Sequence, residues 1–401
     1  MTEQTDTPVL RFPEFKGEWE EKKLGAEVTF YSGLTYKPDD INFEGTFVLR
    51  SSNIKNGKLV DADNVYVDSN KINSTFVNEG DVIVVVRNGS RNLIGKHARV
   101  NTKLSNTVIG AFMTGIRCYN SKFINSLLDT NNFYREIHRN LGATINQITT
   151  GNFKKMSFYF PDDKEKEKIG EFFGKLDRQI ELEEKKVELL EQQKRGYMQK
   201  IFSQQLRFKD ENGNDYPNWA VVKLKDILSE RKEYASKTEN YPHATLSTSG
   251  ITLKSDRYNR DFLVKDKSKK YKVTIMNDIC YNPANLKFGV ITRNRIGSVI
   301  FSPIYITFEV NNGYSPLFIE LLVTRNDFIN RIRKYEEGTV YERMAVKPKD
   351  FLNYETEIPC LEEQKKIGDF LVKIDKLIEN QSKKIDFLKQ RKQGLLQKMF
   401  V

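Results

Sequence analysis

The segment KIGEFFGKLDRQIELEEKKVELLEQQKRGYMQKIF at residues 168–202 returns as KIGDFLVKIDKLIENQSKKIDFLKQRKQGLLQKMF at residues 366–400. When Pro161 is aligned with Pro359, the match runs without a gap to Phe202 and Phe400, and 19 of the 42 positions are identical. Helical composition alone does not produce so many identities. The chain is therefore a tandem duplication with a period of about 195 residues, which is too long for a solenoid and indicates a domain followed by a helix.

Short echoes extend the repeat into the two segments that precede the helices, which we call head 1 and head 2. The matching pairs are LRF at 10–12 and 206–208, Trp19 and Trp219, GDVI at 80–83 and NDIC at 277–280, and FINSLL at 123–128 and FIELLV at 318–323. Elsewhere the heads have diverged too far for gapless alignment. Divergent heads on a preserved helix suggest two different ligands on one repeated support.

Each repeated segment is predicted to form one long helix, because a proline stands before its start, acidic residues follow, and no proline interrupts it. Apolar residues recur about every 3.5 positions over about four heptads, a pattern that is typical of a coiled coil. The predicted coiled-coil seam consists of Ile169, Phe173, Leu176, Ile180, Val187, Leu190, Ile367, Leu371, Ile374, Ile378, Ile385 and Leu388. The alternative interpretation is that the helices separately cover two globular cores.

Polar residues interrupt the seam at the same register in both helices, where Glu183 matches Gln381 and Lys194 matches Lys392. Parallel pairing would place the two lysines against each other in a buried seam, where like charges repel. Parallel helices of about 57 Å would also stretch the middle domain, whereas compact domains usually have neighbouring termini. The sequence therefore predicts antiparallel helices, with a head at each end and the C-terminus near the N-terminus.

The heads contain a mixture of strand and helix patterns. The expected strands are 47–50, 65–67, 81–86 and 304–310, and the expected helices are 121–139 and 316–334. The fold class is therefore α/β, with two heads separated by two long antiparallel coiled-coil helices in a pseudo-two-fold tandem repeat. The predicted domains are residues 1–160 (head 1), 161–203 (first spacer helix), 204–358 (head 2) and 359–401 (second spacer helix).

Composition favours a polyanionic partner in the cytoplasm. The 401 residues include 65 Lys and Arg against 54 Asp and Glu, a net charge of +11, which suits nucleic acid first and an anionic membrane surface second. The sequence contains no run of 18 apolar residues, so no membrane-spanning helix is expected. The N-terminus MTEQTDTPVLRF lacks the pattern of a secretory signal. The three cysteines, Cys118, Cys280 and Cys360, show neither a disulfide framework nor zinc-ligand spacing and fit a reducing compartment.

Catalytic motifs are weak. NPAN at 282–285 resembles the Asn-Pro-Pro-aromatic loop of amino-methyltransferases, but it lacks the second proline and the aromatic residue. PDDK at 161–164 aligns with PCLE at the other helix start, so its acidic residues are interpreted as helix-start chemistry. No Walker loop is found, and the three histidines show no metal-ligand spacing. We therefore expect no catalytic residue and no metal site in this chain.

Basic loops with interleaved amides are the main candidates for binding. Arginine can bracket guanine O6 and N7, asparagine can bracket adenine N6 and N7, and lysine suits phosphates. The predicted DNA-binding residues are Arg50, Asn53, Lys55, Arg87, Asn88, Arg91, Asn92, Lys96, Lys269, Lys270, Asn285, Lys287, Arg293, Arg295 and Arg343. For any single one of them, an ordinary solvated surface is the competing interpretation.

Variable heads that alternate with near-identical helices, whose starts follow the pattern P-x-x-x-E-x-x-K-I-G-x-F, resemble the DNA specificity subunit of type I restriction-modification systems. The resemblance covers essentially the whole chain, and PDDKEKEKIGEFFGKLDRQI and PCLEEQKKIGDFLVKIDKLI are its most specific parts. YSGLTYKPDD at 31–40 is similar to the Gly-x-Thr segment near the start of a head in this family. The first helix start departs from the family by lacking the Glu-Gln pair that the second keeps as Glu363-Gln364.

The resemblance implies that each head is a target recognition domain that reads one half of a split, asymmetric DNA sequence. The helices would set the gap between half-sites and dock two methyltransferase subunits, to which ATP-dependent motor-nuclease subunits add. S-adenosylmethionine, ATP and Mg²⁺ would belong to these partners, and this chain would be a non-catalytic specificity subunit. Two other classes remain open, namely a nucleic-acid-modifying enzyme with an unrecognised active site and a coiled-coil organiser that does not bind DNA.

Overall fold

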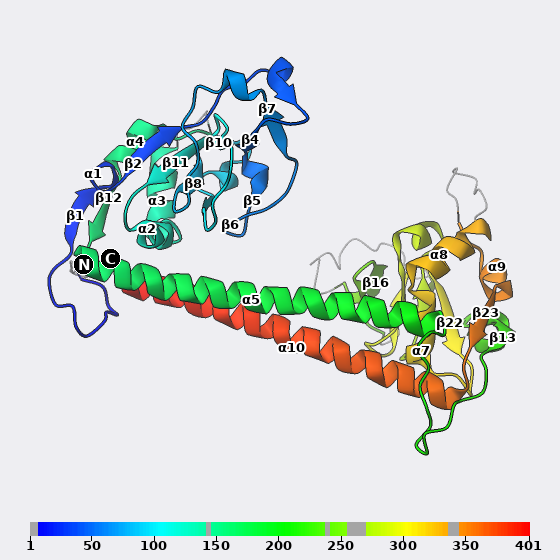
Figure 1. The fold of residues 1–401 in the computed structure, drawn as a ribbon. Helices are drawn as coiled ribbons and strands as arrows, with labels where there is room; N and C mark the ends of the chain where they lie inside the picture. Colours follow the sequence, from blue (N-terminus) through cyan, green and yellow to red (C-terminus); the bar gives the residue numbers. More distant parts are fainter. Residues whose placement is uncertain (1–6, 142–145, 237–240, 255–269, 336–344) are drawn as a thin grey trace. The chain divides into compact units, whose positions relative to one another are not determined.

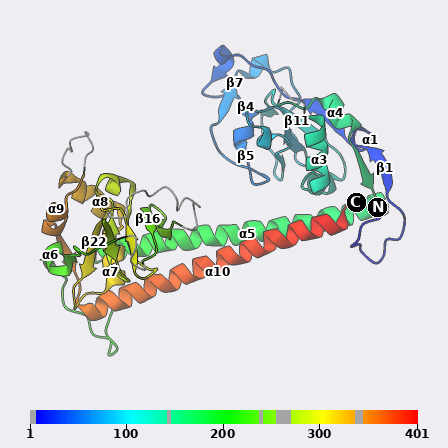
Figure 2. The same ribbon diagram turned by 180° about the vertical axis from the view of Figure 1, so that it is seen from behind.

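The computed structural model describes residues 7–141, 146–236, 241–254, 270–335 and 345–401 (Figures 1 and 2). The chain divides into two compact units. Unit 1 comprises Met1–Glu188 and Asn380–Val401, and unit 2 comprises Leu189–Glu379. Each unit thus contains one head together with parts of both long helices. Within the described residues, no helix is long and apolar enough to cross a membrane.

Head 1 is built on two four-stranded sheets. The first has the order β2 (Thr29–Ser32), β11 (Met113–Arg117), β8 (Val82–Val85), β9 (His97–Arg99), and the second has the order β10 (Thr107–Ile109), β4 (Thr46–Leu49), β7 (Val65–Val67), β3 (Ile41–Asn42). Shorter ladders pair β1 (Glu20–Lys23) with β12 (Ser157–Phe160) and β5 (Ile54–Lys55) with β6 (Lys58–Leu59). The helices are α1 (Leu24–Glu27), α2 (Ser121–Leu128), α3 (Asn131–Asn140) and α4 (Thr150–Lys155).

The apolar run that predicts β8 is buried on both faces. Val82 and Val84 belong to the core formed with the helices, while Ile83 and Val85 belong to a second core that includes Leu49 from β4. Successive side chains of a strand point to opposite faces, so an uninterrupted apolar run fits a strand that lies between two cores. β8 therefore provides a rigid base for the loop that follows it.

Head 2 contains a four-stranded sheet that matches the β2-β11-β8-β9 sheet of head 1. The strand order of this sheet is β14 (Leu228–Glu230), β22 (Ile306–Val310), β19 (Ile279–Tyr281), β20 (Ile291–Arg293). A three-stranded sheet has the order β15 (Tyr234–Ser236), β18 (Lys270–Thr274), β21 (Val299–Phe301). Shorter ladders pair β16 (Ala244–Ser247) with β17 (Gly250–Leu253) and β13 (Ala220–Lys223) with β23 (Glu355–Ile358). The helices are α6 (Leu224–Ile227), α7 (Pro316–Val323), α8 (Asn326–Ile332) and α9 (Pro348–Asn353).

The helices predicted at 121–139 and 316–334 are each divided in two, so the expectation of one continuous helix was wrong in both heads. In head 1 the break falls at Thr130, whose hydroxyl accepts a hydrogen bond from the backbone N–H of Phe133 at 3.2 Å and caps α3. In head 2 it falls at Thr324, whose hydroxyl donates to the carbonyl of Glu320 at 2.7 Å. Threonine side chains compete for backbone hydrogen bonds in this way, and apolar spacing does not reveal that competition.

The long helices α5 (Asp163–Phe202) and α10 (Leu361–Met399) pack against each other in both units. The predicted seam is divided between two environments. Ile180, Ile385, Leu388 and the partly buried Val187 form a cluster between the helices. The other clustered positions are Ile169 and Phe173 in the core of head 1, and Ile367, Leu371, Ile374 and Ile378 in the core of head 2; Leu176 is buried and Leu190 half-buried. Both interpretations of the apolar stripe therefore hold, each for part of it.

In unit 1 the polar breaks in the seam are satisfied across the helix pair. The Nζ of Lys392 lies 2.6 Å from Oδ1 of Asp177, and the Nζ of Lys384 lies 2.6 Å from Oε1 of Glu183. Gln381 also donates to the buried Glu183 carboxylate. Partner numbers fall along α10 as they rise along α5, so the predicted antiparallel direction is confirmed in this unit.

In unit 2 the same direction is found. The Nζ of Lys194 lies 2.5 Å from Oδ1 of Asp375, and the rings of Tyr197 and Phe370 lie 5.1 Å apart, edge to face. Lys194 and Asp375 are the repeat counterparts of Lys392 and Asp177, with the roles of the helices exchanged. Antiparallel pairing gives each seam lysine a carboxylate, whereas parallel pairing would give it another lysine.

A buried ion pair joins the start of each long helix to the first residues of the head that precedes it in the sequence. Arg11 donates to the two carboxylate oxygens of Glu165 at 2.7 and 2.6 Å, and Arg207 donates to those of Glu363 at 2.8 and 2.7 Å. Both glutamates are fully buried. The repeated LRF thus supplies the arginine that neutralises a buried carboxylate, and the first helix start keeps the glutamate of the family's Glu-Gln pair.

The two helix starts differ at the next position. The side chain of Gln364 accepts a hydrogen bond from the backbone N–H of Ser315 at 2.8 Å and donates to the carbonyl of Pro359 at 2.9 Å. Lys166 stands at the equivalent place in unit 1, and its Nζ donates to Oε2 of Glu27 at 2.6 Å. The departure from the family pattern therefore exchanges an amide bridge for an ion pair.

The far ends of the long helices also support the heads. Trp19 contacts Phe123 and Phe400 in unit 1, and Trp219 contacts Phe318 and Phe202 in unit 2. The backbone N–H of Leu10 donates to the carbonyl of Lys398 at 2.8 Å. The predicted approach of the C-terminus to the N-terminus is thereby confirmed within unit 1.

The glycine of each KIG motif permits a close approach between helices. A Cβ on Gly170 would lie 2.7 Å from the backbone nitrogen of Phe123 in α2. A Cβ on Gly368 would lie 2.8 Å from the Cδ2 atom of Leu317 in α7. At Gly170 the neighbouring atom belongs to the backbone of α2, so this position needs a residue without a side chain. At Gly368 it is the end of the flexible Leu317 side chain, which can shift to admit a Cβ.

Candidate nucleic-acid interface

In head 1 the loop after β8 carries the most exposed of the predicted arginines. The backbone N–H of Arg87 donates to the carbonyl of Phe112 at 3.2 Å, and the backbone of Arg87 forms an isolated antiparallel β-bridge with Gln147. The Arg87 guanidinium lies 4.9 Å from the centre of the Phe112 ring, within cation–π range. The side chain is therefore both open to solvent and held by an aromatic neighbour.

Ser51 joins this loop to the turn at 51–53. The Asn88 side-chain amide donates to the Ser51 hydroxyl at 3.2 Å, and the Nζ of Lys96 donates to the Ser51 carbonyl at 3.1 Å. Partial burial lowers the pKa of Lys96. The structure thus brings two of the predicted segments together, and Asn88 and Lys96 hold that junction in addition to facing solvent in part.

Two other predicted residues of head 1 have internal partners. Arg50 donates to a carboxylate oxygen and to the carbonyl of Asp63, each at 2.5 Å. Asn53 is fully buried, and its amide donates to the carbonyl of Ala62 at 2.6 Å and to Asn64 at 3.1 Å. Asn53 therefore shapes the 53–64 segment and offers no group to a base in this conformation. Lys55, Arg91 and Asn92 are exposed.

In head 2 the segment after β19 forms a 3₁₀ turn, Pro283–Phe288, capped by Asn282, whose side chain accepts from the backbone N–H of Ala284 at 3.1 Å. Asn285 and Lys287 on this turn are exposed. The Nζ of Lys287 lies 5.1 Å from the Phe288 ring centre. This turn follows the strand equivalent to β8, so both heads present polar side chains at the same end of the same sheet.

Arg293 and Arg295 share one buried carboxylate. The Nε of Arg293 and the Nη2 of Arg295 lie 3.0 and 2.8 Å from Oε2 of Glu320, and Arg293 also donates to Asn277 at 2.7 Å. The side chain of Arg293 is 17% exposed and that of Arg295 is 64% exposed. Arg293 is therefore anchored within the head, whereas Arg295 can reach a ligand.

These two arginines line a groove of about 520 Å³ in head 2. The β16–β17 turn also lines this groove, through Thr248 and Ser249. Lys270, at the start of β18, is exposed. Two predicted residues, Lys269 and Arg343, lie outside the described residues.

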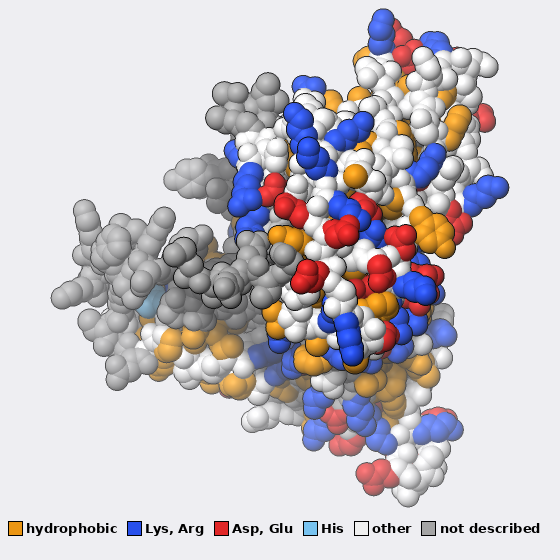
Figure 3. Space-filling view, turned by 90° about the vertical axis from the view of Figure 1, so that its left-hand side faces the viewer, with side chains coloured by type: hydrophobic (Ala, Val, Ile, Leu, Met, Phe, Trp, Pro, Cys, Tyr) orange, Lys and Arg blue, Asp and Glu red, His pale blue; other side chains and the backbone are white. Residues whose placement is uncertain are grey.

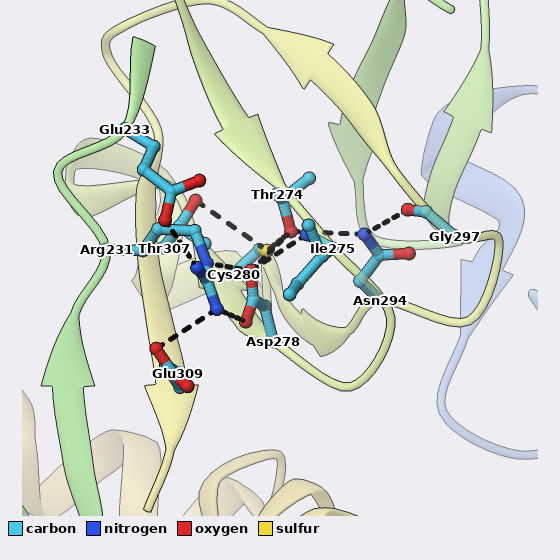
Figure 4. A network of polar contacts seen from close by, with 10 residues as sticks. All are labelled: Arg231, Glu233, Thr274, Ile275, Asp278, Cys280, Asn294, Gly297, Thr307 and Glu309. Atoms are coloured by element: carbon cyan, nitrogen blue, oxygen red, sulfur yellow. Dashed lines mark hydrogen bonds and ion pairs between the residues drawn. The ribbon is translucent and has the colours of Figure 1, made fainter. Parts of the chain in front are cut away.

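Buried polar networks support the central strand of each head. In head 2, Arg231 donates to Asp278 through Nε at 2.8 Å and Nη2 at 3.1 Å, while Thr274 and the backbone N–H of Ile275 donate to the same carboxylate at 3.3 and 2.9 Å (Figure 4). Burial raises the pKa of the neighbouring Cys280 thiol to about 12, so this cysteine stays protonated. The network fixes the start of β19 and hence the turn that follows it.

The equivalent carboxylate in head 1 is Asp81. Arg117 donates to both of its oxygens at 2.8 and 2.7 Å, and the hydroxyl of Tyr31 donates to it at 2.7 Å. Burial and this hydrogen bond raise the pKa of Tyr31. The echo of GDVI and NDIC therefore marks a structural carboxylate that precedes the central strand in both heads.

A second network in head 1 links the β9 strand to α10. The Nε2 of the buried His97 lies 3.3 Å from Oδ1 of Asp129, and the Nζ of Lys392 lies 2.7 Å from the other oxygen of Asp129. Burial would raise the pKa of Asp129, but contact with His97 and the charges of His97 and Lys392 lower it to about 2. Burial lowers the pKa of His97, and contact with Asp129 outweighs this and leaves it raised.

The overall charge does not by itself locate the interface. On the face drawn in Figure 3, Lys and Arg side chains are spread over the surface with Asp and Glu side chains among them. The features that distinguish the candidate interface are the exposed loops at equivalent ends of the two sheets. Among the described residues, no group of three or more His, Cys, Asp or Glu side chains is placed to hold a metal ion.

Sequence reasoning missed residues that matter for this surface. Glu320, which anchors both arginines of head 2, was available as the lone acid in the apolar helix sequence PLFIELLV. Phe112, which supports Arg87, gave no local signal, because its partner is 25 positions away in sequence and the contact depends on the pairing of β8 with β11.

Comparison with known proteins places these features in a family. Residues 16–192 match the type I restriction modification DNA specificity domain. The type I restriction enzyme StySPI specificity subunit of Salmonella potsdam is 24% identical over 353 residues, which cover 82% of this chain and 74% of that protein. The type I restriction enzyme EcoKI specificity subunit of Escherichia coli strain K12 is 25% identical over 236 residues, which cover 55% of this chain and 51% of that protein.

Solved structures share the fold. The crystal structure of the type I restriction-modification system S subunit from M. genitalium is similar over 98% of this chain and 99% of that chain, with a TM-score of 0.58 and 16% identity. A solved structure that addresses complex assembly and conformational transition of the type I restriction-modification system is also similar. The similarity extends over 95% of this chain and 97% of that chain, with a TM-score of 0.53 and 15% identity. Two long packed helices with flanking β-rich domains are thus the architecture of these proteins. The matched domain, the related proteins and the shared fold agree: residues 16–192 belong to the type I restriction modification DNA specificity domain family, and the chain as a whole resembles the specificity subunits of these systems.

Proposed function

We propose that each head of this chain reads one half of a split DNA target. Specificity subunits are the non-catalytic subunits of type I systems. The observation that carries the proposal is the shared strand order of the two heads, β2-β11-β8-β9 and β14-β22-β19-β20, combined with loops of unlike sequence after β8 and β19. Equivalent scaffolds with different exposed loops suit two different half-sites.

The exposed side chains at these loops have the chemistry of base reading. In head 1, Arg87, Arg91 and Asn92 offer the donors and acceptors that match guanine and adenine edges in the major groove. In head 2, Asn285 and Arg295 offer the same groups. The exposed lysines beside them suit phosphates, which position a protein on DNA without specifying sequence.

The long helices are proposed to set the gap between half-sites and to dock two methyltransferase subunits. Support comes from the repeat itself, because 19 of 42 helix positions are identical while the heads diverge. Identical docking surfaces suit identical partners. Motor-nuclease subunits would join this assembly, and S-adenosylmethionine, ATP and Mg²⁺ would be bound by the partner subunits.

The experiment that tests the reading of half-sites is a head exchange with a methylome as its readout. Replacement of residues 20–160 by the corresponding head of another specificity subunit, expressed with the methyltransferase subunits, should change one half of the methylated sequence. The other half and the gap should stay as they are. A change in both halves would contradict independent heads, and purified chain that methylates or cuts DNA without partners would favour an enzyme instead.

The spacing role is tested by lengthening both helices. One heptad inserted after Glu184 and one after Ser382 keeps the apolar stripe in phase. Seven helical residues add about 10 Å, which corresponds to about three base pairs at about 3.4 Å each. The gap selected from a library with both half-sites fixed should therefore grow by up to about three base pairs. Selection of the original gap at full affinity would leave docking as the only role of the helices.

A further inference from the structure

Both heads display an apolar side chain on an equivalent turn, which precedes β11 in head 1 and β22 in head 2. In head 1 the backbone N–H of Met113 donates to the carbonyl of Gly110 at 2.9 Å. In head 2 the N–H of Tyr305 donates to the carbonyl of Ser302 at 3.1 Å. The third residue of these turns is Phe112 in one head, which is 52% exposed, and Ile304 in the other, which is 62% exposed.

The strand register shows that the two positions are equivalent. Four residues after Phe112, Ile116 pairs with Val82 of β8, and four residues after Ile304, Phe308 pairs with Ile279 of β19. The turn sequences, GAFM and SPIY, are otherwise unlike. A single exposed apolar residue is ordinary, but turns favour Gly, Asn, Asp and Ser at such positions. A large apolar residue at the same exposed place in two diverged heads is not explained by packing.

In head 1 this side chain belongs to the surface proposed to meet DNA. The carbonyl of Phe112 accepts hydrogen bonds from the backbone N–H groups of Val86 at 2.9 Å and Arg87 at 3.2 Å, so its backbone is tied to the loop after β8. The Arg87 guanidinium lies over its ring. The polar loop and the apolar residue are therefore presented together, at one end of the sheet.

We propose that Phe112 and Ile304 are specificity-determining residues, each of which contacts the 5-methyl group of a thymine in its half-site. The inference rests on the proposed function, since it needs each head to face a half-site. Arg87 lies beside Phe112, and in head 2 the turn that carries Asn285 follows Tyr281, which pairs with Ile306, two residues beyond Ile304. Arginine and asparagine suit the major groove, and the apolar group that the major groove displays is the thymine methyl. Polar neighbours read hydrogen-bonding edges, and Phe112 and Ile304 read the presence of a methyl group.

The test removes the methyl group from the DNA and the side chain from the protein. The full chain, assembled with its methyltransferase subunits, is titrated with duplexes of the methylome-determined target in which each thymine in turn is replaced by deoxyuridine. Wild-type affinity should fall about fourfold at one thymine of the half-site read by head 1, which is the value of one buried methyl group. Phe112→Ala should bind the thymine and deoxyuridine duplexes equally, and Ile304→Ala should do so for the other half-site.

Matched variants separate this contact from other effects. Phe112→Leu keeps an apolar side chain and should keep the sensitivity to deoxyuridine. Tyr119→Ala removes a ring that is 90% exposed beyond the other end of β11, and it should bind every duplex as wild type does.

Three results would overturn the inference. They are a half-site in which no deoxyuridine substitution weakens wild-type binding, a Phe112→Ala variant that retains the sensitivity, and an equal loss by Phe112→Ala on target and random duplexes. The last result would point to a DNA-backbone contact or to a contact with a partner subunit. A wild-type assembly that prefers no sequence would instead refute the proposed function, and this inference with it.

Discussion

The ion pair at the start of α10 allows a quantitative prediction about stability. Arg207 and Glu363 join the first residues of head 2 to the long helix, and Trp219 also donates to the Glu363 carboxylate at 3.3 Å. The perturbation is Arg207→Met, which keeps most of the volume and removes the charge. The substitution removes the two guanidinium donors and leaves the indole N–H of Trp219 to donate to the buried Glu363 carboxylate.

The magnitude follows from the burial of the two partners. Removal of one partner from a buried ion pair costs about 3–5 kcal/mol, because the other charge stays buried without compensation. Glu363 is fully buried, but the side chain of Arg207 is 23% exposed, so water screens part of the interaction. We therefore expect a loss of about 3 kcal/mol, at the low end of this range. The double variant Arg207→Met/Glu363→Gln should lose less, since neither charge remains.

The assay combines urea unfolding of the full chain with hydrogen exchange followed by mass spectrometry. Arg207→Met should lower the free energy of unfolding of unit 2 and speed exchange at the start of α10, around residues 361–368. Exchange at the start of α5 should stay at the wild-type rate. Arg11→Met is the matched variant of the repeat, and it should give the reciprocal pattern through Glu165.

Two outcomes would refute the reasoning. A loss below about 0.5 kcal/mol, the usual range for surface substitutions, would mean that the pair is not needed to neutralise Glu363. A double variant as unstable as Arg207→Met would mean that lost packing, and not an unpaired charge, causes the effect.

Further predictions concern helix packing, pH and base reading. Gly170→Ala should cost about 1–3 kcal/mol by overpacking, whereas Gly174→Ala, whose Cβ would meet its nearest neighbour at 3.7 Å, should leave the melting temperature unchanged or higher; equal effects would contradict the close approach. The pKa of His97 is raised in the folded state, so its contribution to stability is present below the unfolded pKa near 6.5 and is lost as pH rises through the folded pKa. The free energy of unfolding should therefore fall between pH 6 and 9 more steeply in wild type than in His97→Gln. Identical slopes in the two proteins would refute this. Arg295→Ala should weaken binding to the target by about 1–3 kcal/mol with little change in stability, whereas Arg293→Ala should mainly lower stability; equal losses of affinity at unchanged stability would show that both read bases.

The amino-acid sequence determined the duplication, the two long helices, their direction and the resemblance to type I specificity subunits. These features depend on local periodicity and on a constant offset between the copies, which need no knowledge of tertiary contacts. The apolar stripe predicted that α5 and α10 pack together, and the repeated lysines at 194 and 392 predicted antiparallel pairing, because only that direction supplies each lysine with an acidic partner. LRF and the glycine of KIG are visible as repeats in the sequence, but the contacts that explain them, the ion pairs of Arg11 and Arg207 and the close approach at Gly170, are not.

Tertiary structure decided what each polar side chain does. Asn53 and Arg293 carry the same groups as exposed base readers, yet one is buried against the 60–64 segment and the other is bound to Glu320, 27 positions away. Phe112 and Ile304 became comparable only through the strand register. A sequence pattern records which groups a residue offers. Which of those groups are already satisfied depends on residues that the fold brings from a distance, and burial makes that difference decisive.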